Sequence, residues 1–376
     1  RTRATWSSCV RACAREHSRG ASGAHARVCA RACLCARVCV CARTCVRTAE
    51  AAHAMPSGAL SSVLAPWVRY TRHFANGGTP VLGGEQAALA AADAAEEARS
   101  AERDGGVLAH DFTRRQAEAQ AWRNWDKFYR ANEDRFFKDR HYFGEEAPEL
   151  LGACARAFAR GEAVEPRLLE CGCGAGNTVY PLLELAAELH PGLPLRVSAF
   201  DFAPRAVALV RAKAAAHADG AVDAFVCDLA AGDVGDALPR RVGVGACHAA
   251  TLVFVLSALA PESMPGAVRA VGACLAPGAC VLVRDYAAGD LAEARLAGKG
   301  GGDSGSSRKL GERFYRRGDG TRAYFFEEAE LVRLFEEHAG LRLVRSAVQA
   351  RNIENRRMEL TMRRRWVQAV FERPRR

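Results

Sequence analysis

The feature that most constrains the fold is an apolar run that ends in a carboxylate and opens directly into three alternate glycines, at residues 168–176. The order Leu-Leu-Glu-Cys-Gly-Cys-Gly-Ala-Gly predicts a strand that turns sharply into a helix, because glycine adopts backbone conformations closed to other residues. Such a turn leaves a floor of bare backbone on which a nucleoside-bearing cofactor can lie, as in Rossmann-like sites. A plain structural bend is the alternative interpretation.

The spacing of the glycines also indicates which cofactor the floor suits. Gly172, Gly174 and Gly176 form Gly-x-Gly-x-Gly, without the phosphate-cradling Gly-x-Gly-x-x-Gly or a Walker lysine. A cofactor that carries no phosphate therefore fits better, and S-adenosylmethionine is the leading candidate. We expect all three glycines to belong to its binding site.

Downstream of this motif, short apolar runs alternate with helical segments. This alternation is typical of an α/β, Rossmann-like fold with a mostly parallel sheet covered by helices on both faces. The two last strands follow each other closely, which predicts an antiparallel pair at one edge. The expected strands are 167–171, 195–201, 224–228, 245–253, 279–285, 341–348 and 366–371, and the expected helices include 179–189, 204–216 and 261–275.

Three residues at successive strand ends complete a candidate cofactor site. Asp201 is placed to accept hydrogen bonds from both ribose hydroxyls of an adenosine, and Asp228 to accept one from the adenine amino group. A helix cap or turn residue is the alternative for each of these carboxylates. Val253 is expected to pack on the adenine face. With the glycines, this order favours a class I methyltransferase with a seven-stranded, mostly parallel sheet.

The first 54 residues differ in composition from the rest of the chain. They carry ten Arg against two acids, which supplies +8 of the net charge of +10, and eight of the fifteen Cys. The Cys spacings do not form paired Cys-x-x-Cys knuckles, so we expect no metal site there. We interpret residues 1–54 as a low-complexity segment outside the fold, with Met55 as the working start. A Cys-rich metal protein is the alternative that depends on this segment.

The next segment, residues 55–84, contains no acidic residue and reads as a disordered tail or a mitochondrial or plastid transit peptide. Residues 85–150 are expected to form a helical arm and a module that faces RNA and closes over the cofactor. Residues 151–376 are expected to form the methyltransferase domain, with a Gly/Ser-rich insertion at 298–309. No stretch is apolar enough for a membrane span, and scattered Cys suggest a reducing compartment. We expect a cytoplasmic protein, or an organellar one if 55–84 is a transit peptide.

Several motifs outside the generic fold occur in a fixed order. They are Asn-Trp-Asp-Lys-Phe-Tyr at 124–129, Phe-Phe-Lys-Asp-Arg-His at 136–141, Arg-Asp-Tyr at 284–286 and Gly-Glu-Arg-Phe-Tyr-Arg-Arg-Gly-Asp-Gly-Thr-Arg at 311–322. Together they closely resemble the eukaryotic tRNA N3-methylcytidine methyltransferases of the methyltransferase-like group, from about residue 119 to 371. The short lead-in to the first motif looks most like the branch that acts on serine tRNAs.

The resemblance implies an activity, partners and site residues. The activity is S-adenosylmethionine-dependent formation of N3-methylcytidine in the tRNA anticodon loop, with tRNA as substrate and seryl-tRNA synthetase as a possible partner. Trp125 and Tyr129 would close over the cofactor, and Asp285 and Tyr286 would lie near the target base as catalytic residues. The expected RNA-binding residues are Phe137, Lys138, Arg140, His141, Tyr315, Arg316, Arg317 and Arg322.

The implied chemistry is consistent with these residue types. N3 of neutral cytidine has a lone pair and no proton, so it can attack a sulfonium methyl group without a strong general base. The product base gains positive charge, which a carboxylate such as Asp285 can stabilise. Basic clusters support RNA binding, because residues 308–322 carry six basic against two acidic residues and residues 351–376 carry nine against three.

Two other functions share the same core. A methyltransferase of a small molecule or a protein would explain the glycines, Asp201 and Asp228, but would leave the motifs at 136–141 and 317–322 without a task. A non-catalytic RNA-binding protein with a decayed cofactor site is opposed by the joint presence of Trp125, Tyr129 and the glycines. Binding of S-adenosylhomocysteine separates the second alternative from an enzyme.

Overall fold

The computed structural model describes residues 108–216, 220–298, 307–355 and 360–375. The predictions made for residues 1–54, 55–84 and 85–107, and for most of the insertion at 298–309, lie outside these described residues. Within them no helix is long and apolar enough to cross a membrane.

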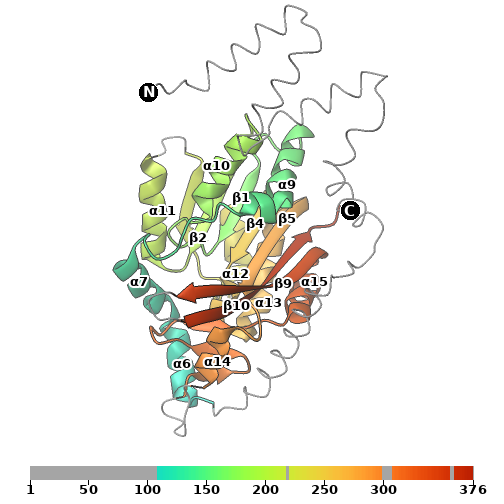
Figure 1. Cartoon of the computed structure of the whole chain (residues 1–376). Helices are drawn as coiled ribbons and strands as arrows, with labels where there is room; N and C mark the ends of the chain where they lie inside the picture. Colours follow the sequence, from blue (N-terminus) through green and yellow to red (C-terminus); the bar gives the residue numbers. More distant parts are fainter. Residues whose placement is uncertain (1–107, 217–219, 299–306, 356–359, 376) are drawn as a thin grey trace, which may run out of the picture. The chain divides into compact units, whose positions relative to one another are not determined.

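A seven-stranded sheet forms the centre of the described part, in the order β3-β2-β1-β4-β5-β10-β9 (Figure 1). The first five strands run parallel, whereas β10 is antiparallel to both β5 and β9. Leu168 and Leu169 in β1 are both fully buried, as expected for a central parallel strand covered on both faces. The strands are β1 (Arg167–Cys171), β2 (Arg196–Asp201), β3 (Val222–Val226), β4 (Cys247–Val253), β5 (Leu275–Tyr286), β9 (Arg342–Asn355) and β10 (Leu360–Glu372).

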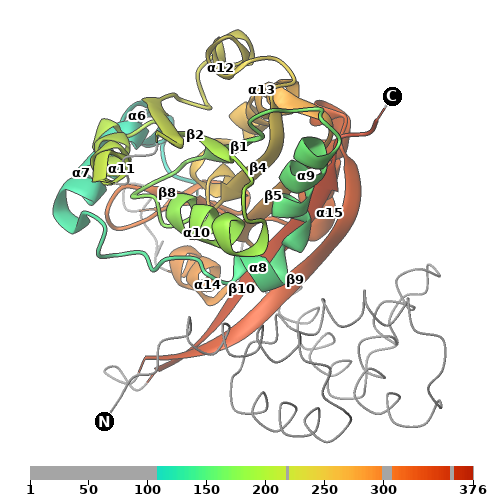
Figure 2. The ribbon, with the colours of Figure 1, turned by 90° about the horizontal axis from the view of Figure 1, so that it is seen from above.

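Helices cover both faces of this sheet, and each layer encloses its own apolar core (Figure 2). One layer contains α9 (Pro148–Ala159), α10 (Val179–Leu189) and α11 (Pro204–Ala216); the other contains α12 (Val234–Val242), α13 (Met264–Cys274) and α15 (Glu328–Ala339). Proline at the first position of α9 and left-handed Gly340 after α15 mark helix ends of the usual kind. The result is the sheet and layer order of a class I methyltransferase.

A second group of elements lies beyond the carboxyl ends of the parallel strands. It consists of α6 (Asp111–Ala119), α7 (Ala121–Asn132), α8 (Phe143–Glu146), α14 (Leu291–Ala297), the 3₁₀ turns η1 (Leu256–Ala258) and η2 (Pro261–Ser263), and a three-stranded sheet of β6 (Lys309–Gly311), β7 (Phe314–Arg316) and β8 (Arg322–Tyr324). A backbone hydrogen bond of 2.8 Å from Ala109 to Lys309 joins the helical pair α6 and α7 to the small sheet. These elements surround the edge at which the candidate site residues converge.

The α/β architecture, the seven strands and the antiparallel edge pair are confirmed. Most strand ends lie within a few residues of the expected ones, but β9 ends seven residues later and β10 begins six residues earlier than expected. The third strand was expected to reach residue 228 but ends at Val226, so Asp228 lies in the following loop. The helix expected at 261–275 is divided into η2 and α13. The predicted domain boundary at 150/151 falls inside α9, which packs on β4 and β5. Helices α12 and α15 and the small sheet were not predicted.

Candidate active site

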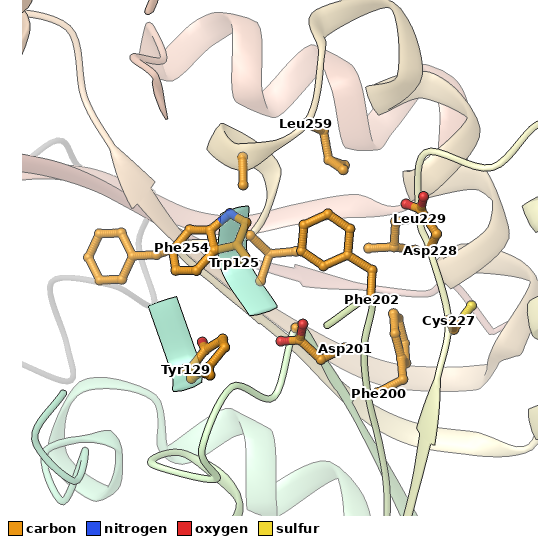
Figure 3. Close-up of a pocket in the computed structure, with 13 residues that line it drawn as sticks. Trp125, Tyr129, Phe200, Asp201, Phe202, Cys227, Asp228, Leu229, Phe254 and Leu259 are labelled. Carbon is orange, nitrogen blue, oxygen red and sulfur yellow. The ribbon is translucent and has the colours of Figure 1, made fainter. Parts of the chain in front are cut away.

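A cavity that is open to solvent, with about 500 Å³ of empty space including its mouth, lies at the carboxyl ends of β1 to β4 (Figure 3). It is lined by Trp125, Tyr129, Gly172, Phe200, Asp201, Phe202, Cys227, Asp228, Leu229, Phe254, Val255, Ala258 and Leu259. Most of this lining is apolar or aromatic, and two carboxylates provide the charged groups. Such a lining suits a planar base with a polar sugar attached.

The glycine motif forms one side of this cavity by keeping side chains out of it. Gly172 has φ +63°, and a Cβ added there would lie 2.5 Å from a methyl carbon of Val255. Gly174 has φ +53°, and a Cβ there would lie 2.7 Å from the Tyr129 hydroxyl oxygen. Gly176 differs, because its Cβ would instead meet the ring of Tyr180 in α10. Of the three predicted cofactor glycines, only Gly172 lines the cavity itself.

Asp201 ends β2 and presents a buried carboxylate to the cavity. One oxygen accepts a hydrogen bond from the Gly174 amide at 3.0 Å and the other from the Ala203 amide at 2.9 Å. Burial raises the pKa of Asp201 to about 6, although these amide hydrogen bonds oppose the rise. Each oxygen retains acceptor capacity. The carboxylate therefore orders the glycine turn and faces a cofactor at the same time.

Asp228 is exposed and lies in the loop after β3, where it also lines the cavity. Its Oδ1 accepts a hydrogen bond of 2.8 Å from the amide of Ala230, two residues further on. This is the turn geometry that the sequence allowed as an alternative. The second oxygen has no protein partner among the described hydrogen bonds, so the turn role leaves an acceptor for a ligand.

Val253 requires a correction. Its side chain is buried in the core between the sheet and α9 to α11, and it does not line the cavity. The next two residues, Phe254 and Val255, line the cavity. Phe254 has φ +59°, a left-handed conformation that is rare for a residue with a bulky side chain. This backbone turn directs the ring of Phe254 to the cavity, and alternation along the strand could not have predicted it.

Helix α7 covers the open side of the cavity with the aromatic pair predicted from the sequence. Trp125 and Tyr129 are one helical turn apart and stack at 6.0 Å between ring centres, and both enter the cavity (Figure 3). Tyr129 is buried, and burial next to Asp201 raises the pKa of its hydroxyl well above the ordinary value. Its hydroxyl oxygen stays protonated and sits over Gly174.

This geometry fits S-adenosylmethionine in its chemistry as well as its shape. The lining offers apolar side chains for the adenine, the Asp201 carboxylate for ribose hydroxyls and the glycine backbone for a ligand without phosphates. A profile described as a methyltransferase domain matches residues 139–346. The cofactor is S-adenosylmethionine.

Curated relatives narrow the assignment. The tRNA N(3)-cytidine methyltransferase METTL6 of Mus musculus is 38% identical over 279 residues, which cover 74% of this chain and 90% of that protein. A tRNA N(3)-methylcytidine methyltransferase of Schizosaccharomyces pombe is 35% identical over 251 residues, 66% of this chain and 74% of that protein. The tRNA(Thr) (cytosine(32)-N(3))-methyltransferase of Saccharomyces cerevisiae is 39% identical over 252 residues, 67% of this chain and 37% of that protein.

The chain belongs to the tRNA N(3)-cytidine methyltransferase family.

In this family member, the two predicted catalytic residues at the end of β5 differ in their surroundings. Asp285 is fully buried, and its oxygens accept hydrogen bonds from the amides of Ser257 at 3.0 Å and Tyr286 at 2.9 Å. Burial raises the pKa of Asp285 to about 6, against these hydrogen bonds and the nearby Arg317. Asp285 thus fixes the loop after β4, which carries Phe254, and does not itself line the cavity.

Tyr286 is half-buried and lies beside the cofactor cavity. Its ring packs against Phe254 at 4.8 Å and Phe325 at 5.7 Å. The guanidinium of Arg317 lies over the same ring at 5.0 Å, and that of Arg364 at 5.8 Å. Arg364 is held by an ion pair of 2.9 Å with the buried carboxylate of Asp290. An aromatic surface with Arg317 over it, next to the cofactor wall, is suited to a base and a flanking phosphate.

The motif at 136–141 is tied to the glycine turn. Asn177 donates from its amide to the Phe137 carbonyl oxygen at 3.1 Å and to Asp139 at 2.9 Å. The guanidinium of Arg140, which was predicted to face RNA, is partly buried and donates to the Thr178 hydroxyl at 2.6 Å, so it also anchors the segment. Phe137 packs beside Trp125 and Phe128, whereas Lys138 and His141 are exposed.

Two further predicted RNA-binding residues need correction. Tyr315 is fully buried in a cluster with Phe325 and has no face available to a base. Arg322 is 2% exposed and forms an ion pair with Glu118, which holds α6 against the small sheet. Arg316 and Arg317 are half-exposed, and Arg317 is the one that reaches Tyr286. A charged motif alone does not distinguish cations that bind a substrate from those that join two elements.

Proposed function

We propose that this protein transfers a methyl group from S-adenosylmethionine to N3 of a cytidine in the anticodon loop of tRNA, and that serine tRNAs are its substrates. The observation that carries the proposal is a shared wall. Phe254 lines the cofactor cavity and also packs against Tyr286, which carries Arg317 over its ring. Membership in the family supports the reaction, and this shared wall offers a place where the target base can lie next to the cofactor.

The residues of the cavity bind and orient the cofactor. Asp201 accepts from the ribose hydroxyls, Asp228 accepts from the adenine amino group, and apolar residues such as Leu259 contact the adenine. Trp125 and Tyr129 cover the site and exclude water. When bound, S-adenosylmethionine supplies an electrophilic methyl group on its sulfonium. These contacts hold the reacting groups in line, which is the main catalytic requirement when the nucleophile needs no base.

The target base is held by aromatic stacking. A cytidine in a loop must be turned out of its neighbours before N3 is accessible, and stacking on an aromatic ring offsets that cost. Tyr286 and Phe254 provide the rings, and Arg317 binds an adjacent phosphate. Because N3 carries its own lone pair, no side chain has to remove a proton before attack.

Asp285 acts on the charge that develops during the reaction. Its ionised carboxylate is buried and accepts a hydrogen bond from the Tyr286 amide, and a buried charge acts over a longer distance than a charge in water. The base becomes cationic as the methyl group is transferred, so the carboxylate favours the product-like state. Asp285→Asn should lower the rate of methylation and leave the affinity for S-adenosylhomocysteine nearly unchanged. A comparable loss of cofactor affinity would assign Asp285 a purely structural role.

The proposal also covers the class of tRNA substrate, the protein partner and the cellular compartment. The relative from Saccharomyces cerevisiae is named for cytosine 32 of a threonine tRNA. The lead-in to the motif at 124–129 supports the serine branch and seryl-tRNA synthetase as a partner. The seven described cysteines are all free thiols, six of them buried, which agrees with a reducing compartment such as the cytoplasm.

The test is to incubate the full chain with S-adenosylmethionine and total tRNA, digest the RNA and measure N3-methylcytidine by mass spectrometry. The nucleoside should appear, should map to the anticodon loop of serine tRNAs, and should be lost with Asp201→Ala. A second reaction contains added seryl-tRNA synthetase. Absence of N3-methylcytidine from both reactions, while S-adenosylhomocysteine still binds, would refute the proposal.

A further inference from the structure

Two residues of the motif at 124–129 have no part in the site described so far. Asn124 and Asp126 flank Trp125 on α7, and each side chain reaches a different neighbouring element. The Asn124 side-chain amide donates to the carbonyl oxygen of Gly320 at 2.9 Å, and Asp126 Oδ1 accepts from the Arg205 amide at the start of α11 at 2.9 Å. Helix α7 is thus held on one side to the methyltransferase core and on the other to the small sheet.

Gly320 belongs to the turn between β7 and β8. The turn is closed by a hydrogen bond of 2.7 Å from the Arg317 amide to the Thr321 carbonyl oxygen. Gly320 has φ +83°, and a Cβ added there would lie 2.8 Å from the Asn124 amide nitrogen. Both the backbone conformation and the approach of Asn124 therefore require glycine at this position.

The other end of the same turn reaches the proposed base site. Arg317 lies over the ring of Tyr286, Tyr286 packs on Phe254, and Phe254 lines the cofactor cavity. Helix α7 contacts the same cavity, because Trp125, the neighbour of Asn124, also lines it. Both α7 and the β7–β8 turn are therefore connected to the cofactor cavity as well as to each other. A ligand that fixes the position of α7 over the cavity therefore also fixes the turn that positions Arg317.

We propose that Asn124 is a positioning residue that couples the two substrates: cofactor binding beneath α7 strengthens RNA binding at the Arg317 turn, and RNA binding strengthens cofactor binding. This inference rests on the proposed function for the identity of the RNA. Linkage requires that both effects have the same size, typically fivefold or more. The Glu118–Arg322 ion pair holds the small sheet to α6 independently, so loss of the Asn124 hydrogen bond frees the turn without detaching the sheet.

The test compares binding constants of the full-length protein. The dissociation constant of tRNA is measured with and without S-adenosylhomocysteine, and that of S-adenosylhomocysteine with and without tRNA. The variant is Asn124→Asp, which keeps the size of the side chain but replaces the donor by a carboxylate facing the Gly320 carbonyl. The matched control is Lys127→Gln, which changes the charge by the same amount on an exposed position of the same helix.

In the wild type and the control, each ligand should tighten binding of the other by the same factor. In Asn124→Asp this factor should fall by about threefold to tenfold, the range expected for one hydrogen bond. The affinity for S-adenosylhomocysteine without RNA should change by less than about twofold. The KM for tRNA at saturating cofactor should rise more than kcat falls, a pattern that general damage to the fold would not produce.

A second variant separates the hydrogen bond from the added charge. Asn124→Ala removes the donor and introduces no carboxylate, so it should lower the coupling factor by a similar threefold to tenfold. An unchanged factor in either variant would overturn the inference and would leave the proposed methylation activity standing. Failure of the wild type to bind tRNA at all would overturn the proposed function as well, so the two failures are distinguishable.

Discussion

Alanine at position 174 should damage the cofactor site through the hydroxyl group of Tyr129. The Cβ of Gly174→Ala would lie 2.7 Å from that oxygen but 3.5 Å from the adjacent ring carbon, which is an ordinary van der Waals contact. The overlap therefore concerns one oxygen atom. Because Tyr129 is buried against Trp125 and Phe128, it has little room to retreat.

Two costs add at this position. A left-handed backbone with a Cβ costs about 1–2 kcal/mol, and an overpacked contact costs about 1–3 kcal/mol. The second cost also shifts Tyr129 over the cavity, so the Kd of S-adenosylhomocysteine should rise about tenfold, which corresponds to about 1.4 kcal/mol. Gly176→Ala is the matched comparison, because it has the same kind of strain at φ +88° but meets Tyr180 outside the cavity. It should destabilise the protein with a smaller effect on the cofactor.

Removal of the hydroxyl group provides the decisive assay. In Gly174→Ala with Tyr129→Phe, the overlap disappears and the backbone cost remains. Isothermal calorimetry should find S-adenosylhomocysteine binding restored to within about threefold of Tyr129→Phe alone, and thermal melting should recover only in part. If the double variant binds no better than Gly174→Ala, the oxygen contact does not transmit the defect, and the reasoning is refuted.

Three other outcomes follow from the structure. The ionised Asp201 carboxylate accepts hydrogen bonds from the ribose hydroxyls, so the Kd of S-adenosylhomocysteine should be constant above pH 7. As the pH falls below the Asp201 pKa of about 6, this Kd should rise by up to about tenfold per pH unit. Calorimetry should find no such pH dependence in Asp201→Asn. Glu118→Ala removes the carboxylate from buried Arg322 and should lower the free energy of unfolding by about 2 kcal/mol in urea melts, with Glu118→Gln less affected. Tyr286→Leu should raise the KM for tRNA about tenfold with little change in stability, whereas Tyr315→Leu should do the reverse, losing about 2 kcal/mol; equal effects of the two would contradict the assigned roles.

Much of the cofactor site was predictable because its determinants are local. A glycine that must adopt positive φ, and an acid at the end of a strand, are read from neighbouring residues. Gly172 and Asp201 accordingly lie where the sequence indicated, and Asp228 lines the cavity from the loop that follows β3. The helical spacing of Trp125 and Tyr129 also predicted that they share a face, although only the resemblance directed that face to the cofactor.

The errors occurred where distant segments meet. Arg322 and Tyr315 belong to a motif whose charge and aromatic content suggest RNA binding. Glu118, about two hundred residues away in the sequence, neutralises Arg322. Tyr315 is enclosed in the core beside the small sheet. Val253 was chosen by strand position, but the left-handed backbone of Phe254 turns the next side chain into the cavity. Burial and pairing of this kind depend on contacts that no local pattern contains.

The sequence by itself determined the α/β class, the glycine turn after β1, the acid at the end of β2 and the family, because periodicity, backbone freedom and motif order are properties of short stretches of chain. Only the tertiary structure decided which charged residues remain available and which hold elements together. It also decided that Asn124 meets Gly320 across 196 positions of sequence. Such a contact exists only after the chain has folded, because packing brings together groups that the sequence keeps far apart.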